Sequence, residues 1–152
     1  MRLAPGNPFY HSRISCSMFY LLYVSRETYK MTSKDLREIL AVARERNGQC
    51  GISGLLLYKN GRFMQFLEGP EEAVRSLMNK LSVDERHQEV MVLEEDIEET
   101  RQFPTWAMAF KCMDDRVVDS EIKSIEHNEP MYSEALQSSK VVQLMQFFNV
   151  YS

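Results

Sequence analysis

The dipeptide Asn60-Gly61, set between two apolar runs, most restricts how this chain can fold. The runs are CGISGLLLY, residues 50–58, and GRFMQFLEG, residues 61–69. Asn-Gly between apolar runs is the strongest short-range signal for a two-residue β-hairpin, because both residues adopt positive φ readily. The two runs are therefore predicted to pair antiparallel. Both faces of the second run are largely apolar, which indicates a strand in the middle of a sheet.

Hydrophobic periodicity and capping signals predict the other elements. Thr32 and Asp35 have the spacing of a capping box, which opens a helix. Gly48 is positioned to end that helix. In order, the sequence predicts a strand at 19–25, a helix over 32–48, the two hairpin strands, a helix opened by residues 69–72, and strands at 89–95 and 106–113.

This order, βαββαββ, predicts an α+β, ferredoxin-like sheet with two helices on one face. The other face then needs cover, and residues 133–151 offer an apolar helical stripe that packs on it or on another subunit. The stripe consists of Val141, Leu144, Met145 and Phe148, widened by Val142, Phe147 and Val150. We expect a flexible extension at 1–17, the domain at 18–113 and a C-terminal helical cap at 114–152.

Charge and composition exclude several classes of protein. The formal net charge of −4 argues against binding to nucleic-acid phosphates. Arg44 and Arg46 are interpreted as offsetting a helix dipole, and holding an anion is the alternative. No apolar run approaches the roughly 20 residues of a membrane span. Three scattered cysteines indicate reduced thiols and a cytoplasmic location, and no spacing predicts a metal site.

Gln65 is a primary amide in the middle of a predicted core strand. Buried without partners, such a group costs roughly 1–3 kcal/mol. If the first and third strands are neighbours, Tyr23 and Gln65 meet on the face toward the helices, and Asn47 points to the same region. On the pattern alone, structural roles are favoured: Gln65 on a backbone carbonyl, Tyr23 in the core and Asn47 as a helix cap. Convergence of all three would form a pocket for a flat ligand with polar edges.

A set of motifs, taken in order, resembles the BLUF family of blue-light sensors, which use a flavin, usually FAD. The resemblance covers residues 18–113. The motifs are LLYVS, RNGQCGISGLLLY, GRFMQFLEGP, LSVDERH and FPTWAMAF.

The resemblance implies a role for each matching residue. Tyr23 matches the photoactive tyrosine and Gln65 the switching glutamine, while Trp106 and Met108 match a pair that relays the signal. The implied flavin contacts are Asn47 at the ring edge, Ile39 and Leu81 flanking the ring, Lys80 where relatives often carry Arg, and Asp84, Arg86 and His87 on the polar side or ribityl chain. No role is carried over to Arg46.

The implied function is a photoreceptor that is not an enzyme, with light rearranging the hydrogen bonds among tyrosine, glutamine and flavin. We expect no further output domain, because residues 114–152 are too few to form one. We therefore expect output through protein contacts of the cap, in a homodimer or larger oligomer, without nucleic acid or membrane. FAD is expected, with FMN left open. The alternatives are a light-insensitive scaffold and an acylphosphatase-like enzyme; SRETYK (25–30) has Arg26 but lacks the glycine-rich cradle such an enzyme needs.

Overall fold

A five-stranded sheet forms the centre of the chain, which a computed structural model describes over residues 18–103, 107–113 and 139–151. The strand order is β4-β1-β3-β2-β5. Only β5 runs parallel to its neighbour, β2; the other pairs are antiparallel. The elements are β1 (Met18–Glu27), α2 (Ser33–Cys50), β2 (Ser53–Lys59), β3 (Arg62–Gly69), α3 (Glu71–Ser82), β4 (His87–Glu98), β5 (Ala109–Cys112) and α6 (Ser139–Tyr151). This confirms the predicted α+β, ferredoxin-like fold.

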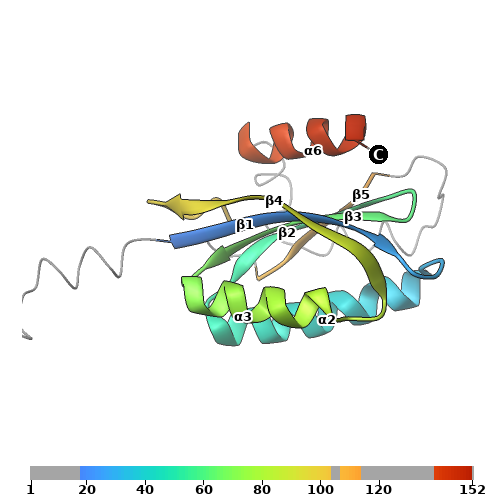
Figure 1. Ribbon diagram of the computed structural model, residues 1–152, viewed down its shortest axis with the longest axis horizontal. Coiled ribbons are helices and arrows are strands. Elements are labelled where there is room, and N and C mark those ends of the chain that lie inside the picture. The colour runs from blue at the N-terminus through green and yellow to red at the C-terminus, as the bar shows by residue number, and fades with distance from the viewer. Residues whose placement is uncertain (1–17, 104–106, 114–138, 152) are drawn as a thin grey trace, which may run out of the picture.

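Helices cover both faces of the sheet: α2 and α3 lie on one side and α6 on the other (Figure 1). Because side chains alternate along β3, Phe63 and Leu67 join the core beneath α2 and α3, while Met64 and Phe66 join the core beneath α6. The sheet thus separates two hydrophobic cores, and its central strand contributes to both.

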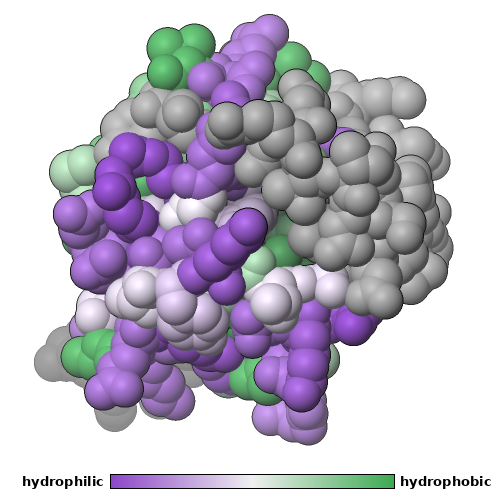
Figure 2. All heavy atoms as spheres, turned by 90° about the vertical axis from the view of Figure 1, so that its right-hand side faces the viewer, coloured by the Kyte–Doolittle hydropathy of each residue, from purple (hydrophilic) through white to green (hydrophobic). Residues whose placement is uncertain are grey.

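Helix α6 covers the face that the sequence predicted to need cover. Leu144 and Phe148 are buried against that face. Val142, Phe147 and Val150 point outward and are exposed. Figure 2 shows hydrophobic atoms at the top of the molecule, where α6 lies in Figure 1, above a mainly hydrophilic side. Of the two predicted placements, packing on the chain's own sheet is the one observed.

Helix α2 begins as predicted and ends later. The Thr32 hydroxyl accepts a hydrogen bond from the Asp35 amide (3.2 Å), and the Asp35 carboxylate accepts one from the Thr32 amide (2.9 Å). The predicted end at Gly48 is wrong, because the helix continues to Cys50 and Gly51 caps it in the left-handed conformation at φ 71°. Arg46 therefore lies before the last turn, and the helix-dipole interpretation of Arg44 and Arg46 is wrong.

The hairpin between β2 and β3 forms as predicted, with Asn60 at φ 51° and Gly61 at φ 75°. Several other boundaries differ from the sequence prediction. Strand β1 is longer at both ends than 19–25, and β4 is longer at both ends than 89–95. Strand β2 begins at Ser53 because α2 uses Cys50, and β5 is shorter than 106–113. Helix α3 has Pro70 as its N-cap and begins at Glu71.

The predicted extension at 1–17 and the cap before residue 139 lie outside the described residues. The structure therefore tests the cap only through α6. Among the described helices, none is long and apolar enough to cross a membrane.

Candidate functional site

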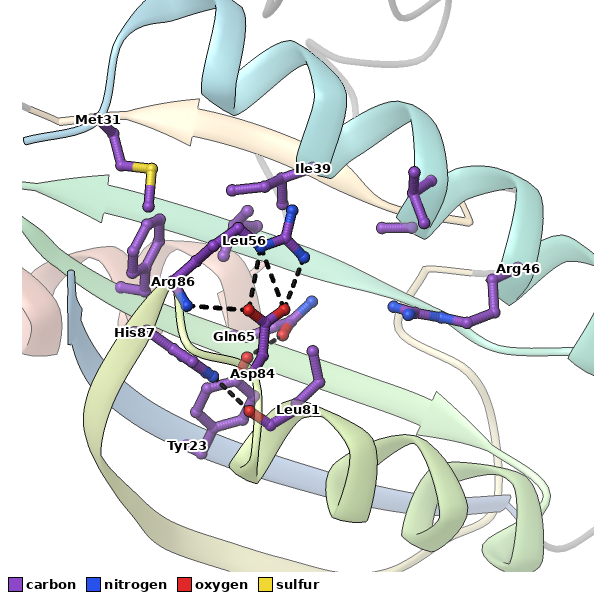
Figure 3. A pocket seen from close by; sticks show the side chains of 13 residues that line it. Tyr23, Met31, Ile39, Arg46, Leu56, Gln65, Leu81, Asp84, Arg86 and His87 are labelled. Carbon is purple, nitrogen blue, oxygen red and sulfur yellow. Dashed lines mark hydrogen bonds and ion pairs between the residues drawn. The ribbon is translucent and has the colours of Figure 1, made fainter. Parts of the chain in front are cut away.

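A cavity lies between the sheet and the two helices α2 and α3 (Figure 3). Its empty volume is about 580 Å³, with the open mouth included. This volume falls in the range of small-molecule sites. The lining residues are Tyr23, Met31, Ile39, Val42, Ala43, Arg46, Leu56, Phe63, Gln65, Leu81, Asp84, Arg86 and His87.

Tyr23 and Gln65 form the polar part of the cavity floor. They are directly paired residues of β1 and β3, and both are buried. The Tyr23 hydroxyl donates a hydrogen bond to Gln65 Oε1, and Gln65 Nε2 donates one to Met108 Sδ at 3.6 Å. The predicted meeting of Tyr23 and Gln65 is therefore confirmed, whereas Asn47, the third residue of the predicted convergence, does not line the cavity. The alternative for Gln65, a bond to a backbone carbonyl at a sheet end, is wrong, because its hydrogen-bond partners are the side chains of Tyr23 and Met108.

The environment of Tyr23 keeps its phenol protonated. Burial raises the pKa of Tyr23 well above its ordinary value, the negative charge of Asp84 raises it further, and the positive charge of Arg46 lowers it. At neutral pH the hydroxyl is thus a hydrogen-bond donor, and Gln65 Oε1 is its acceptor.

Asp84 and Arg86 form an ion pair at the polar side of the cavity. Arg86 Nε lies 3.0 Å and 3.2 Å from the two carboxylate oxygens of Asp84, and Arg86 Nη2 lies 2.6 Å from Oδ2. This hydrogen bonding lowers the pKa of Asp84 and raises that of Arg86. Both groups are therefore charged, and Arg86 is engaged by its own neighbour.

His87 joins the cavity to the backbone of α3 and to β1. Its Nε2 lies 2.5 Å from the Leu81 carbonyl and its Nδ1 lies 2.8 Å from Ser25 Oγ. A carbonyl only accepts, so Nε2 carries a proton and donates it to this bond. In the neutral ring, Nδ1 then accepts from the Ser25 hydroxyl.

One face of α2 supplies a wall of the cavity. Ile39, Val42, Ala43 and Arg46 follow the helical spacing i, i+3, i+4 and i+7, so they lie on one side of the helix. Arg46 extends from α2 toward the space between the two helices (Figure 3). Its Nε is buried and has no hydrogen-bond partner among the described residues.

The other predicted site residues lie apart from the cavity lining. Asn47 is fully buried in α2; its Nδ2 donates to the Ala107 carbonyl at 2.9 Å, and its Oδ1 has no partner in the described part of the chain. Its alternative role as a cap before Gly48 is wrong, since it lies inside the helix. Lys80 is exposed on α3. Met108 is buried beside Gln65, while Trp106 lies outside the described residues.

Sequence reasoning missed several lining residues although the signal was available. Helical spacing from Ile39 marks Val42, Ala43 and Arg46, and alternation along β3 marks Phe63 beside Gln65. The residues missed are Met31, Val42, Ala43, Arg46, Leu56 and Phe63.

The cavity suits a flat, polar-edged aromatic ligand. Apolar side chains from the sheet and both helices enclose it, and a few polar groups converge at its centre. One buried polar atom of the lining, Arg46 Nε, lacks a partner within the described residues and can bond a ligand. The fold and site together define a ferredoxin-like, ligand-binding domain, and these residues fit a flavin.

The family described as "BLUF: Sensors of blue-light using FAD" matches residues 18–109, and the chain belongs to this family of flavin-binding blue-light sensors. A curated relative, the photoactivated adenylate cyclase subunit beta of Euglena longa, is 39% identical over 89 residues. The match covers 58% of this chain and 10% of that protein. The chain thus spans about a tenth of the length of this relative.

Two solved structures show the same architecture. The dark-state structure of BlrB, a BLUF protein, is 28% identical with a TM-score of 0.63, and the match covers 85% of this chain and 92% of that chain. The structure of Klebsiella pneumoniae BlrP1 with FMN and cyclic diGMP is 30% identical with a TM-score of 0.59. That match covers 77% of this chain and 33% of BlrP1.

Proposed function

We propose that this chain is a blue-light photoreceptor in which Tyr23 and Gln65 rearrange their hydrogen bonds beside a bound flavin. The observation that carries the proposal is the bond from the Tyr23 hydroxyl to Gln65 Oε1 on the cavity floor. A primary amide can exchange donor and acceptor by turning end for end, without any change of charge. The pair therefore offers two arrangements of similar shape.

The residues act in a defined order. A bound flavin supplies blue-light absorption and, when excited, a strong oxidant. Tyr23 would give up an electron to this oxidant, and its hydroxyl proton would pass to Gln65 Oε1, the acceptor already in place. The electron would then return, and Gln65 would give a proton back to Tyr23. A proton from Oε1 would leave an amide that can stay turned, and a proton from Nε2 would leave the tautomer. No covalent bond forms and no net oxidation occurs.

Met108 is suited to register the new arrangement. In the present arrangement Gln65 Nε2 donates to Met108 Sδ. A turned amide directs Oε1 toward the sulfur instead, and two acceptors cannot bond each other. Met108 directly precedes β5, and its carbonyl accepts from Arg44 Nε at 3.0 Å. Met108, with Trp106 as the second predicted relay residue, is therefore our candidate route to the output.

Light-minus-dark absorption spectra of three purified variants test this proposal. Tyr23→Phe and Gln65→Leu are expected to retain flavin and to lose the reversible red shift that the wild type shows. Tyr58→Phe is the matched control, because Tyr58 is also a buried tyrosine of the sheet but its hydroxyl bonds Glu27 (2.8 Å) outside the cavity. A normal red shift in Tyr23→Phe or Gln65→Leu would refute the assigned roles.

The cofactor we propose is FAD, following the family description. The BlrP1 structure was obtained with FMN, so the flavin class alone does not decide between the two. Release of the flavin by heat, followed by chromatography against FAD and FMN standards, identifies it. Recovery of FMN alone would contradict the choice of FAD.

The output we propose is a protein contact of the C-terminal helical segment, in a homodimer or larger assembly. Support comes from the outer side of α6, where Val142, Phe147 and Val150 are exposed. Light scattering of the purified chain in darkness and under blue light measures this. A monomer under both conditions would exclude self-association. Neither a nucleic acid nor a membrane is proposed as partner, and the cytoplasmic location stays a prediction from cysteine usage.

Two other functions would be separated by the same spectra. A light-insensitive scaffold would bind flavin, or none, and show no red shift in the wild type. An acylphosphatase-like enzyme would hydrolyse acyl phosphates in the dark. We favour the sensor because the family consists of sensors and the Tyr23–Gln65 pair is formed.

A further inference from the structure

Arg46 is a cation that lines the cavity, and its buried Nε has no hydrogen-bond acceptor in the part of the chain that the structure describes. It comes from α2, one residue before Asn47, and lines the cavity together with Ile39 and Ala43. Its Nε is buried without a hydrogen-bond partner among the described residues. A buried N–H that stays unpaired is costly, so the position is explained best by an acceptor that a ligand brings.

The other basic side chains near the site are already engaged or lie outside it. Arg86 bonds both carboxylate oxygens of Asp84. Arg44 donates its Nε to the Met108 carbonyl, and Lys80 is exposed and does not line the cavity. Among the described residues that line the cavity, Arg46 is thus the cation that Asp84 does not neutralise.

The positive charge of Arg46 lies near the floor of the cavity. Its charge is close enough to lower the pKa of the Tyr23 phenol, which lies on the fully buried floor. A cation in that position suits the polar edge of a flavin ring, because the phosphates of FMN or FAD carry charges that favour the solvent at the mouth.

We propose that Arg46 is a positioning residue that hydrogen-bonds the polar edge of the flavin ring and favours the reduced, negatively charged form of the flavin over the oxidised form. This inference rests on the flavin-binding function proposed above. The guanidinium supplies a fixed donor and a charge that cannot be lost at neutral pH. Charge-assisted hydrogen bonds are about twice as strong as neutral ones, so removing the charge weakens ring binding.

The test is a titration of the apoprotein in the dark with riboflavin and with FMN, which share the ring and differ in the phosphate. Arg46→Gln is expected to weaken the binding of both by a similar factor, about tenfold. The flavin reduction potential is expected to become more negative in Arg46→Gln and to return toward the wild-type value in Arg46→Lys. Arg37→Gln is the matched control, because it removes the same charge from an exposed position of α2.

Two results would overturn the inference. A loss of affinity for FMN with riboflavin unchanged would assign Arg46 to the phosphate, and unchanged affinities with an unchanged potential would place it outside the site. Both measurements are made in the dark. A wild type that binds flavin but shows no light-induced red shift would therefore refute the photoreceptor and leave the role of Arg46 standing.

Discussion

Truncation of two adjacent phenylalanines in α6 should have very different effects on stability. Phe148 is fully buried between α6 and the sheet, with 0% of its surface exposed, whereas Phe147 is 49% exposed. Removing a buried ring uncovers roughly 100–130 Å², worth about 3 kcal/mol at 25 cal/mol per Å². The cavity left behind raises the expected cost of Phe148→Ala to about 3–5 kcal/mol. For Phe147→Ala we expect about 1 kcal/mol, because half of that ring already contacts water.

Urea unfolding of the full chain, followed by far-UV circular dichroism, measures both changes. The two variants lose the same atoms from neighbouring positions of one helix, so helix propensity changes equally and cancels in the comparison. Equal destabilisation by the two variants would refute the reasoning, since it would mean that α6 does not hold its Phe148 side against the sheet.

Two further predictions concern the sheet. Gly54→Ala places a Cβ 2.0 Å from the backbone oxygen of Phe66 and should disrupt the pairing of β2 with β3, lowering the melting temperature strongly. Gly48→Ala meets nothing within 4 Å and should instead stabilise α2 by about 0.5–1 kcal/mol, and the reverse order of melting temperatures would be incompatible with the fold. Burial raises the pKa of Glu98 from 4.5 to about 8, and the hydrogen bond with Glu68 is the second-largest cause of this increase. The folded state therefore binds more protons than the unfolded state between those values, so stability should fall as pH rises from 4.5 to 8. Glu98→Gln should flatten that slope in urea midpoints taken at pH 5, 6.5 and 8.5, and parallel slopes would contradict this origin.

Local signals in the sequence predicted the elements that local chemistry controls. The Asn60-Gly61 turn and the Thr32 capping box involve residues that are neighbours in the chain, so their patterns were sufficient. The end of α2 was missed because glycines stand at both 48 and 51, and only Gly51 adopts the left-handed conformation. That choice depends on where the chain must turn to enter β2, which no local pattern records.

Strand order predicted the centre of the site, and side-chain geometry supplied the rest. Alternation along two neighbouring strands was enough to bring Tyr23 and Gln65 together. Arg46 was assigned to the helix dipole because its sequence neighbourhood resembles a helix end. Lys80 was expected near the ligand because the resemblance places it where relatives often carry Arg. Adjacent helical residues point about 100° apart, however, and of Lys80 and Leu81 only Leu81 lines the cavity.

The position of β3 has a mechanical consequence. Its residue 65 faces the ligand cavity, while its residues 64 and 66 face α6 on the far side of the sheet. Successive side chains of a strand point to opposite faces of the sheet. A twist of β3 that redirects the Gln65 amide therefore also tilts the side chains of residues 64 and 66, in the opposite direction. Such a twist would carry a change at Gln65 directly to the face of the sheet that α6 covers, in addition to the proposed route through Met108.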